Sequence, residues 1–408
     1  MQKLKSLLRL SRSLHGNGSV CRQTRCFSAL PGYTLPDYAQ EEMVPVEGKA
    51  VSRMAILNRP SALNAINDSM VTRLSKLYKA WEETSDVAFV MMKGGGQRPF
   101  CSGTDVVELY RLLNEGNTEQ CKTFFQNLYK FVYVIGTYLK PHVGIMDGIV
   151  MGGGAGISLP GMFRIVTDRT VFSTPEVKIG FHPDAGASYY LSRLPGYLGE
   201  CLALTGIQLS GPGMVAYGLA THYTLKERLP LVEERLGNLI TDDPSFIDNC
   251  LVQYCNLEYP DQRSSHNELE TINSIFNNDT VEDIVEALET EAIRTGNEWC
   301  TTVLNKIKEG SPLSLKVTLE SIRRGRFQTL DQCLAREYRT SLKFISKDFS
   351  NDFLEGVRAR LVDKDFTPKW SPHKLEDVTD DMVASFFAPL DKLEQELNLP
   401  VSVREPDV

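Results

Sequence analysis

The chain has 408 residues, of which 42% are hydrophobic and 24% are charged. This composition is typical of a folded globular protein with a full core, and it excludes a mainly disordered chain. The nine cysteines are scattered, without a C-x-x-C pair or histidines at ligand spacing, which favours a reducing compartment and argues against a bound metal. No apolar run reaches the roughly 20 residues of a membrane-spanning helix, so we expect no membrane partner.

The first 31 residues differ in kind from the rest of the chain. They contain six basic residues and no acidic residue, with leucines between Leu4 and Leu10 that fall on one side of a helix. A basic, serine-containing and acid-free start is typical of a mitochondrial or plastid transit peptide. We therefore predict that residues 1–31 are a mitochondrial transit peptide and that the mature protein lies in the mitochondrial matrix.

Charge limits the partners of the mature protein. The whole chain has 44 basic and 52 acidic residues, a net charge of −8; without the six cations of residues 1–31, 38 against 52 leaves −14. Such an acidic chain is a poor general binder of nucleic acid, so we expect no direct nucleic-acid contact. An anionic ligand would need basic groups placed locally at its site.

The elements after residue 42 alternate between strand and helix patterns. Apolar stretches at 43–46 and 51–57 predict paired strands, and residues 86–92 predict a buried strand. Between them, Asn67 to Ser69 offer N-caps for an amphipathic helix. Its apolar face consists of Met70, Val71, Leu74, Leu77 and Trp81. Strand, helix and strand in turn predict an α/β fold with crossover connections.

Two glycine-containing junctions follow. Residues 99–105 lead into a predicted helix at 106–113, and after a helix at 123–139 a buried strand at 141–146 leads to the triple glycine 152–154. Glycine lets the backbone approach a ligand, and a helix start exposes unpaired N–H groups. Each junction could therefore aim one N–H group at the same carbonyl oxygen. Taken alone, three glycines fit a tight turn equally well.

Two carboxylates, Glu176 and Asp184, lie in a loop-like segment that Pro175, Gly180 and Pro183 interrupt. A pair of close carboxylates suits general acid–base or nucleophilic chemistry, and their proximity would raise the pKa of one of them. The spacing alone also fits a helix cap or a solvated turn.

These motifs together resemble the crotonase (enoyl-CoA hydratase/isomerase) superfamily in their order and spacing. The resemblance rests on residues 58–60, 63–65, 100–105 and 147–156. Within the superfamily, the chain is similar to the 3-hydroxyisobutyryl-CoA hydrolase branch, through residues 175–186, 204–206, 218–222, 311–316, 355–359 and 363–370.

The resemblance implies a spiral of ββα repeats with a helical C-terminal region. We expect the crotonase core at 32–241, the helical region at 242–385 and a tail at 386–408. The implied oxyanion hole uses the N–H groups of Thr104 and Gly153, and the implied catalytic residues are Glu176 and Asp184. The implied reaction hydrolyses a short 3-hydroxyacyl-CoA of valine catabolism; coenzyme A belongs to the substrate, and no separate cofactor is expected.

Three positions depart from the hydrolase branch. Thr104 stands where relatives more often have glycine, Leu128 where they tend to carry an acidic residue, and His182 where an aromatic residue is common. The first two changes predict altered contacts with substrate. For His182 we expect packing or hydrogen bonding rather than catalysis.

Two other functions stay open. Proteins that resemble this branch have been recruited to the mitochondrial small ribosomal subunit, so association with that ribosome is one alternative. An enoyl-CoA hydratase or isomerase is another, although hydratases normally carry a second glutamate at the position of Gly156. We also expect a homo-oligomer.

The region from about 242 to 370 reads as mostly helical, with Thr280 as an N-cap and further helices at 314–322 and 330–345. Its most basic patch either is a solvated helix end or binds the phosphates of coenzyme A. The patch consists of Lys316, Arg323, Arg324 and Arg326.

Overall fold

The computed structural model describes residues 37–96, 99–255, 262–347, 349–391 and 394–402. The predicted transit peptide, residues 1–31, lies outside the described residues. The described residues form one compact unit, to which everything below refers.

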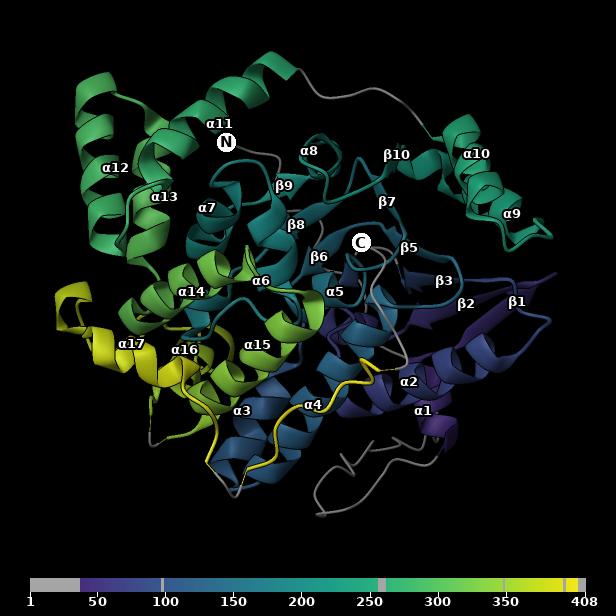
Figure 1. Cartoon of the computed structure of the whole chain (residues 1–408), viewed down its shortest axis with the longest axis horizontal. Coiled ribbons are helices and arrows are strands. Elements are labelled where there is room, and N and C mark those ends of the chain that lie inside the picture. The colour runs from purple at the N-terminus through teal and green to yellow at the C-terminus, as the bar shows by residue number, and fades with distance from the viewer. Residues whose placement is uncertain (1–36, 97–98, 256–261, 348, 392–393, 403–408) are drawn as a thin grey trace, which may run out of the picture. The chain divides into compact units, whose positions relative to one another are not determined.

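Two β-sheets form the centre of the fold (Figure 1). Neighbouring strands are parallel except for the antiparallel pairs β1–β2 and β8–β9. In order across the sheet, the six-stranded sheet consists of β1 (Val46–Lys49), β2 (Ser52–Leu57), β3 (Phe89–Gly94), β5 (His142–Met146), β7 (Phe163–Thr167) and β10 (His222–Thr224). The four-stranded sheet consists of β4 (Pro99–Cys101), β6 (Ile149–Met151), β8 (Val171–Ser173) and β9 (Leu209–Ser210).

The chain winds between the two sheets. It places β3, β5 and β7 in the larger sheet and follows each with a strand of the smaller one, namely β4, β6 and β8. Parallel neighbours need crossover connections, and helices α2 (Asp68–Glu83), α4 (Thr118–Gly136) and α5 (Gly153–Gly156) provide them before β3, β5 and β7. This spiral of ββα repeats confirms the predicted fold class.

The larger sheet is covered on both faces, and its central strands are accordingly mostly apolar. Side chains of β3 alternate between two hydrophobic clusters: Val90 and Met92 join one, and Phe89 and Met91 join the other. Helices α9 (Leu229–Gly237) and α10 (Pro244–Tyr254) close the second cluster through side chains such as Leu236. The first cluster contains the site described below.

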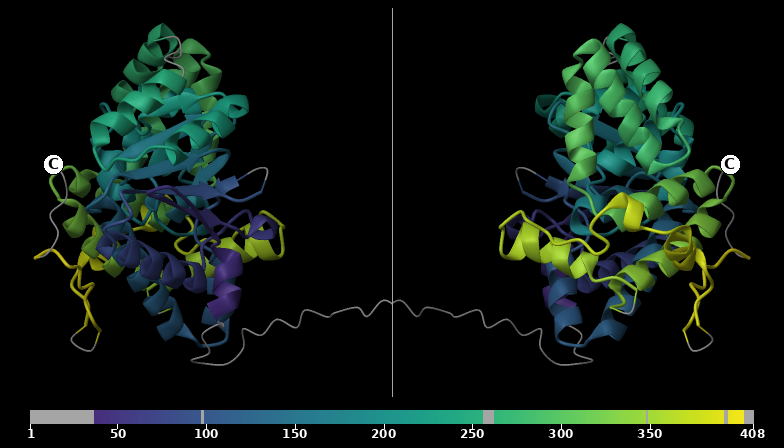
Figure 2. Two further views of the ribbon diagram at one scale, coloured as in Figure 1. Left: turned by 90° about the vertical axis from the view of Figure 1, so that its right-hand side faces the viewer. Right: turned by 90° about the vertical axis from the view of Figure 1, so that its left-hand side faces the viewer.

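The second half of the chain is mostly helical, as predicted. It contains α11 (Gln262–Phe276), α12 (Val281–Thr295), α13 (Glu298–Lys308), α14 (Pro312–Gly325), α15 (Leu330–Ile345), α16 (Asp352–Val357) and α17 (Asp380–Phe387). Figure 2 shows these green and yellow helices beside the blue and teal elements of the first half. Helix α14 packs on α7 (Leu198–Thr205), and α15 packs on α4. Both halves contribute to one core, and the division at residue 241 stays a proposal about organisation.

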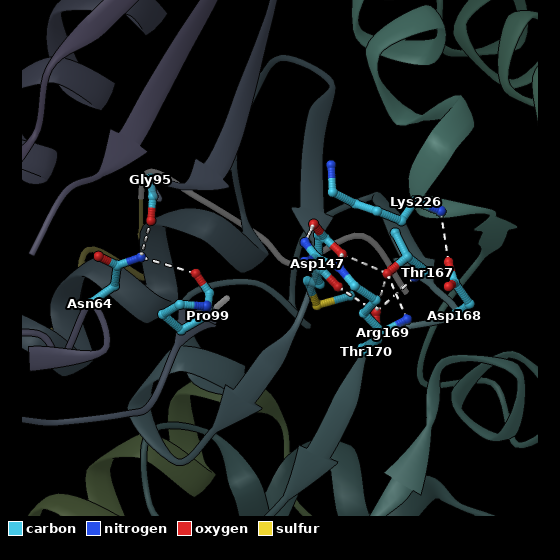
Figure 3. Close-up of polar contacts among 10 residues, drawn as sticks. Asn64, Gly95, Pro99, Asp147, Thr167, Asp168, Arg169, Thr170 and Lys226 are labelled. Carbon is cyan, nitrogen blue, oxygen red and sulfur yellow. Dashed lines mark hydrogen bonds and ion pairs between the residues drawn. The ribbon is translucent and has the colours of Figure 1, made fainter. Parts of the chain in front are cut away.

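Polar contacts hold the segments that enter β4 and β6 (Figure 3). Asn64 adopts a φ of 55° and donates from its side-chain amide to the Pro99 carbonyl oxygen at 3.0 Å. Asp147, between β5 and β6, accepts from the Thr167 hydroxyl at 2.7 Å and from Arg169 Nε at 3.1 Å. These contacts fix the strands that end at the two glycine-containing junctions.

Most predicted helix boundaries are close to the observed ones. The Asn67 side chain caps α2 by accepting from the Met70 N–H at 3.0 Å. Helix α3 runs over Val106–Asn114, and α15 has the predicted limits of 330 and 345.

The first predicted strand was wrong in its limits. Met43 ends helix α1 (Asp37–Met43), and β1 runs over Val46–Lys49 with all four residues exposed. An exposed edge strand has no buried face and therefore no apolar alternation to detect. The predicted strand at 86–92 begins only at Phe89 and continues to Gly94.

Candidate active site

A cavity of about 300 Å³ lies where the two glycine-containing junctions meet the segment that carries the carboxylates. All four site residues predicted from the sequence line it. They are Thr104, Gly153, Glu176 and Asp184, together with apolar side chains that include Phe125, Phe181 and Phe353.

The two predicted N–H donors lie side by side. A Cβ atom placed on Gly153 would be 3.4 Å from the Thr104 backbone nitrogen. Gly153 is the first residue of α5, where a helical N–H has no partner within the helix. Neither the Thr104 N–H nor the Gly153 N–H donates a hydrogen bond within the described part of the chain. Both remain available to a ligand oxygen.

The loop that carries Thr104 is fixed on both sides. Ile66 donates from its N–H to the Gly103 carbonyl oxygen at 2.8 Å and accepts from the Asp105 N–H at 2.9 Å. In this parallel bridge the N–H of Thr104 itself points away from Ile66. Asp105 also caps α3 through Glu108 and pairs with Arg59 at 2.9 Å.

Glu176 is packed against the triple glycine. It begins the 3₁₀ helix η2 (Glu176–Ile179), and a Cβ on Gly152 would meet Glu176 Oε1 at 2.8 Å. Gly152 has a φ of 47° and a ψ of −127°, a backbone conformation that residues with a Cβ rarely adopt. Glycine at position 152 is thus required both by the backbone and by the carboxyl group.

Burial dominates the electrostatics of Glu176. Its side chain is 7% exposed, and Oε2 has no hydrogen-bond partner among the described residues. Burial and, secondarily, the nearby Asp184 charge raise the pKa of Glu176 well above its ordinary value. The hydroxyl of Thr104 is likewise buried in the cavity without a described partner. Buried polar atoms left unpaired in a cavity are available to bind a ligand or water.

Asp184 lies on a strained loop between η2 and α6 (Ala187–Tyr190). The residue after it, Ala185, has a φ of 56°, and Gly186 has a φ of 90°. Tyr129, on α4, donates from its hydroxyl to Asp184 Oδ2 at 2.6 Å. Burial raises the pKa of Asp184 to about 7, the Tyr129 hydrogen bond opposes this rise, and the Glu337 charge adds to it.

Helix α15 holds the same loop from the other side. Glu337 accepts from the Gly186 N–H at 2.6 Å, from the Ser188 N–H at 2.8 Å and from the Ser188 hydroxyl at 2.6 Å. Arg336 donates to the Ser188 hydroxyl oxygen at 3.0 Å. A buried acid that accepts three hydrogen bonds is well satisfied, so this contact fixes the path of the loop.

One departure from the hydrolase branch, Leu128, and the position that distinguishes hydratases, Gly156, lie beside this site. Leu128 is fully buried, and its Cδ2 would be 3.7 Å from a Cβ on Gly153. The side chain at this position therefore faces the donor pair with an apolar surface. Gly156, the position of the second glutamate in hydratases, has no room for a side chain, because a Cβ there would meet the Ala185 carbonyl oxygen at 2.5 Å.

Basic groups also line the cavity, although they differ from the predicted ones. Lys178 and Arg360 belong to its lining, and both approach Glu309, at 3.1 Å and 3.6 Å. The basic residues picked from the sequence do not line this cavity. Each binds elsewhere: Lys316 pairs with Glu282, Arg324 with Glu320 and Arg326 with Glu200, and Arg323 donates to the carbonyl oxygen of Asp279.

Sequence reasoning missed Tyr129, Glu337 and Arg360, because they reach the site from distant segments. One signal was available: Glu337 and Ser341 interrupt the apolar stripe of α15 formed by Leu330, Leu334 and Ile345. Among the described residues, no three His, Cys, Asp or Glu side chains are grouped as a metal site would require. In the same part of the chain, no helix is long and apolar enough to cross a membrane.

Comparison with known proteins agrees with this geometry. Residues 52–387 match the family described as enoyl-CoA hydratase/isomerase. The chain belongs to this family.

Three relatives illustrate its range. The small ribosomal subunit protein mS47 of Arabidopsis thaliana is 60% identical, with 100% of both chains covered. The mitochondrial 3-hydroxyisobutyryl-CoA hydrolase-like protein 1 of Arabidopsis thaliana is 55% identical over 89% of this chain and 90% of its own. The crystal structure of a carnitinyl-CoA dehydratase from Mycobacterium thermoresistibile matches with a TM-score of 0.79 and 36% identity, covering 88% of this chain and 99% of that one.

Proposed function

We propose that the chain is a thioester hydrolase for 3-hydroxyisobutyryl-CoA or a similar short 3-hydroxyacyl-CoA. One observation carries the proposal: two buried carboxyl groups and two free backbone N–H groups share one cavity. Acyl transfer needs donors for the carbonyl oxygen and a base or nucleophile beside the carbonyl carbon. A relative with 55% identity is named a 3-hydroxyisobutyryl-CoA hydrolase-like protein, which supports this substrate class.

The proposed oxyanion hole consists of the N–H groups of Thr104 and Gly153. Negative charge grows on the thioester oxygen as the carbonyl carbon becomes tetrahedral, and two fixed donors stabilise it. Each such donor typically contributes about 3 kcal/mol in the transition state. The nearby hydroxyl of Thr104 narrows the space around the oxygen.

Glu176 can act in two ways. As a base, its carboxylate takes a proton from water while the water oxygen adds to the carbonyl carbon; the tetrahedral intermediate then expels the thiolate of coenzyme A, which takes that proton. As a nucleophile, it attacks that carbon itself, the thiolate of coenzyme A leaves, and water then hydrolyses the anhydride. In both routes the products are the free acid and coenzyme A thiol.

We assign Asp184 a positioning role for the substrate hydroxyl or the attacking water. Its carboxyl group lines the cavity and is anchored by Tyr129 at 2.6 Å. With Leu128 apolar beside the donors, Asp184 is the polar group that we expect to contact the 3-hydroxyl.

Lys178 and Arg360 suit the anionic part of coenzyme A. They add positive charge to the cavity of a chain whose overall charge is negative. Phosphates need such local cations to approach against the overall field. Coenzyme A enters as part of the substrate, and the proposed reaction needs no separate cofactor.

The first experiment measures free thiol released from 3-hydroxyisobutyryl-CoA and other short acyl-CoAs by the purified chain. We expect release by the wild type and none by Glu176→Gln, which keeps the size of the side chain. Glu320→Gln, at an exposed ion pair away from the cavity, is the matched control. Absence of thiol release from every short 3-hydroxyacyl-CoA would contradict the proposal.

Association with the small subunit of the mitochondrial ribosome is a second candidate. It is favoured by the match to the small ribosomal subunit protein mS47 over 100% of both chains, beyond the 52–387 region of the family. Sedimentation of a mitochondrial lysate tests it: a ribosomal component co-sediments with small subunits, whereas a free enzyme stays near the top of the gradient as a monomer or small homo-oligomer. Glu176→Gln should not change this behaviour, so the two functions are tested independently.

A hydratase or isomerase fits less well. The crowding at Gly156 leaves Glu176 without the second glutamate that hydratases use, and a single-glutamate isomerase does not need Asp184. The protein is mitochondrial, as the name of the hydrolase-like relative indicates, and we propose the matrix as its compartment.

A further inference from the structure

A chain of side-chain hydrogen bonds leads from the Asp184 carboxyl group into the protein interior. Tyr129 Oη lies 2.6 Å from Asp184 Oδ2 and 2.7 Å from Ser341 Oγ. Ser341 Oγ in turn lies 2.8 Å from His182 Nε2. All four side chains are buried, so bulk water does not compete for these hydrogen bonds.

The protons in this chain can be placed by counting donors. An ionised Asp184 only accepts, so the single proton of Tyr129 is used on the carboxylate. The Tyr129 oxygen then accepts from Ser341, whose only proton is used there. Ser341 must therefore accept from His182, which requires a proton on Nε2. The hydrogen bonds are thus all donated in one direction, from His182 through Ser341 and Tyr129 to Asp184.

The surroundings of His182 suit this role. The ring is fully buried and stacks on Phe344, with centroids 5.4 Å apart and planes at 19°. Burial, together with the positive charge of Arg336, lowers the pKa of His182 to about 3. A neutral ring has one N–H donor, and the contact with Ser341 determines which nitrogen carries the proton.

The chain joins three separate parts of the fold. Tyr129 comes from α4, Ser341 from α15, and His182 from the loop that also carries Asp184. Helix α15 thus contacts this loop twice on one face, through Ser341 and through Glu337 four residues before it. The helical C-terminal region therefore helps to build the site.

We propose that Tyr129, Ser341 and His182 are positioning residues for the hydrolysis: they orient the Asp184 carboxylate through a one-directional hydrogen-bond chain. This inference rests on the proposed function of the cavity. By donating to the carboxylate, the chain also opposes the effect of burial and favours ionised Asp184. The titratable groups that face Asp184 are Glu176 on η2, Tyr190 on α6, Glu337 on α15 and Tyr129 itself.

The first test is the pH dependence of kcat/KM in Tyr129→Phe, which removes only the hydroxyl. The carboxylate loses its donor, so the acid-side ionisation step to which Asp184 contributes should move up by about one pH unit. Tyr138→Phe is the matched control, because it removes another buried hydroxyl, which donates to the Tyr78 carbonyl oxygen at 2.7 Å. A Tyr129→Phe enzyme that is slowed equally at every pH would overturn the proposal.

Ser341→Ala and His182→Phe test the outer part of the chain. Both should move the same step in the same direction by a smaller amount, because they act through Tyr129. If Tyr129→Phe shifts the profile and neither of the other variants does, the chain ends at Tyr129, and the roles of Ser341 and His182 are refuted.

A readout without turnover separates this inference from the proposed function. Nitrogen NMR of the histidine rings should show His182 neutral and protonated at Nε2 at pH 8, with its signal assigned by its loss in His182→Phe. A charged ring, or a ring protonated at Nδ1, would refute the proposed chain of hydrogen bonds. If no acyl-CoA is hydrolysed, the proposed function fails. The NMR result still decides whether the chain of hydrogen bonds exists.

Discussion

The carbonyl oxygen of Ala185 lies 2.5 Å from the point that a Cβ on Gly156 would occupy. The last residue of α5 and the Asp184 loop are therefore packed backbone against backbone. Any side chain at position 156 must displace the loop that carries one of the two carboxyl groups.

Gly156→Ala should lower the free energy of unfolding by about 1–3 kcal/mol, the usual cost of overpacking. Gly156→Glu should not create hydratase activity, because its side chain cannot enter without moving Asp184. Chemical denaturation and a crotonyl-CoA hydration assay measure these effects. Gly213→Ala is the control, since its Cβ would meet nothing closer than 3.4 Å. Hydratase activity in Gly156→Glu would show that the loop can move aside.

Gly153→Ala should reduce kcat while leaving the fold intact. The added methyl group would lie 2.8 Å from the Thr104 hydroxyl oxygen and 3.4 Å from the Thr104 nitrogen, in the space between the proposed donors. Loss of one donor typically lowers kcat by about 10² to 10³. Steady-state kinetics, with circular dichroism as the folding control, measure this. A rate within a factor of about three of the wild type would argue against the assigned oxyanion hole.

Activity should depend on pH through the carboxyl pair. Burial raises the pKa of Asp184 to about 7 and that of Glu176 well above its ordinary value, so both are largely protonated in acid. Two pH units below its pKa, a group is only about 1% ionised. We therefore expect kcat/KM to fall as pH drops below about 7, where Asp184 becomes protonated, and the coupled ionisation of Glu176 to steepen this fall. A flat profile from pH 5 to 8 would contradict the proposed roles.

The contribution of Asp184 to stability should change with pH in the opposite direction to the activity. Its pKa is higher in the folded protein than in the unfolded chain, so its contribution to stability is present at low pH and is lost as pH rises through about 7. Asp184→Asn should therefore raise the free energy of unfolding at pH 8, by about 1 kcal/mol or more, and have little effect at pH 4. Urea denaturation at both pH values measures this; a loss of stability at pH 8 would mean that the charged form is well stabilised.

Lys178→Ala and Arg360→Ala should raise KM and leave kcat nearly unchanged. The rise in KM should be about tenfold for each 1.4 kcal/mol of lost phosphate contact. A short pantetheine thioester without the nucleotide phosphates is the matched control substrate, and its KM should not change. Lys316→Ala, which pairs with Glu282 away from the cavity, is the control variant. Equal effects on both substrates would place the two residues against the acyl group rather than the phosphates.

The α/β pattern, the cap at Asn67 and the helix at 330–345 were all predictable, because they depend on residues close together in the sequence. The glycine-containing junctions were also found, since a glycine run before a helix is a local signal. The cationic lining of the cavity was not predicted from the sequence. Lys178 and Arg360 approach the same Glu309 from segments about 180 residues apart, which no local pattern encodes.

The sequence by itself determined the class of the protein and the chemical groups of its site. The donor positions 104 and 153 and the carboxyl groups at 176 and 184 were predicted from the resemblance of these motifs to a known family, because residue type and spacing alone also fit a tight turn or a helix cap. Only the tertiary structure decided how these groups behave. Burial raises the pKa values of the carboxyl groups, Tyr129 and helix α15 hold the Asp184 loop, and the Ala185 carbonyl excludes a side chain at Gly156. Desolvation, long-range hydrogen bonds and steric exclusion arise only when distant segments pack together.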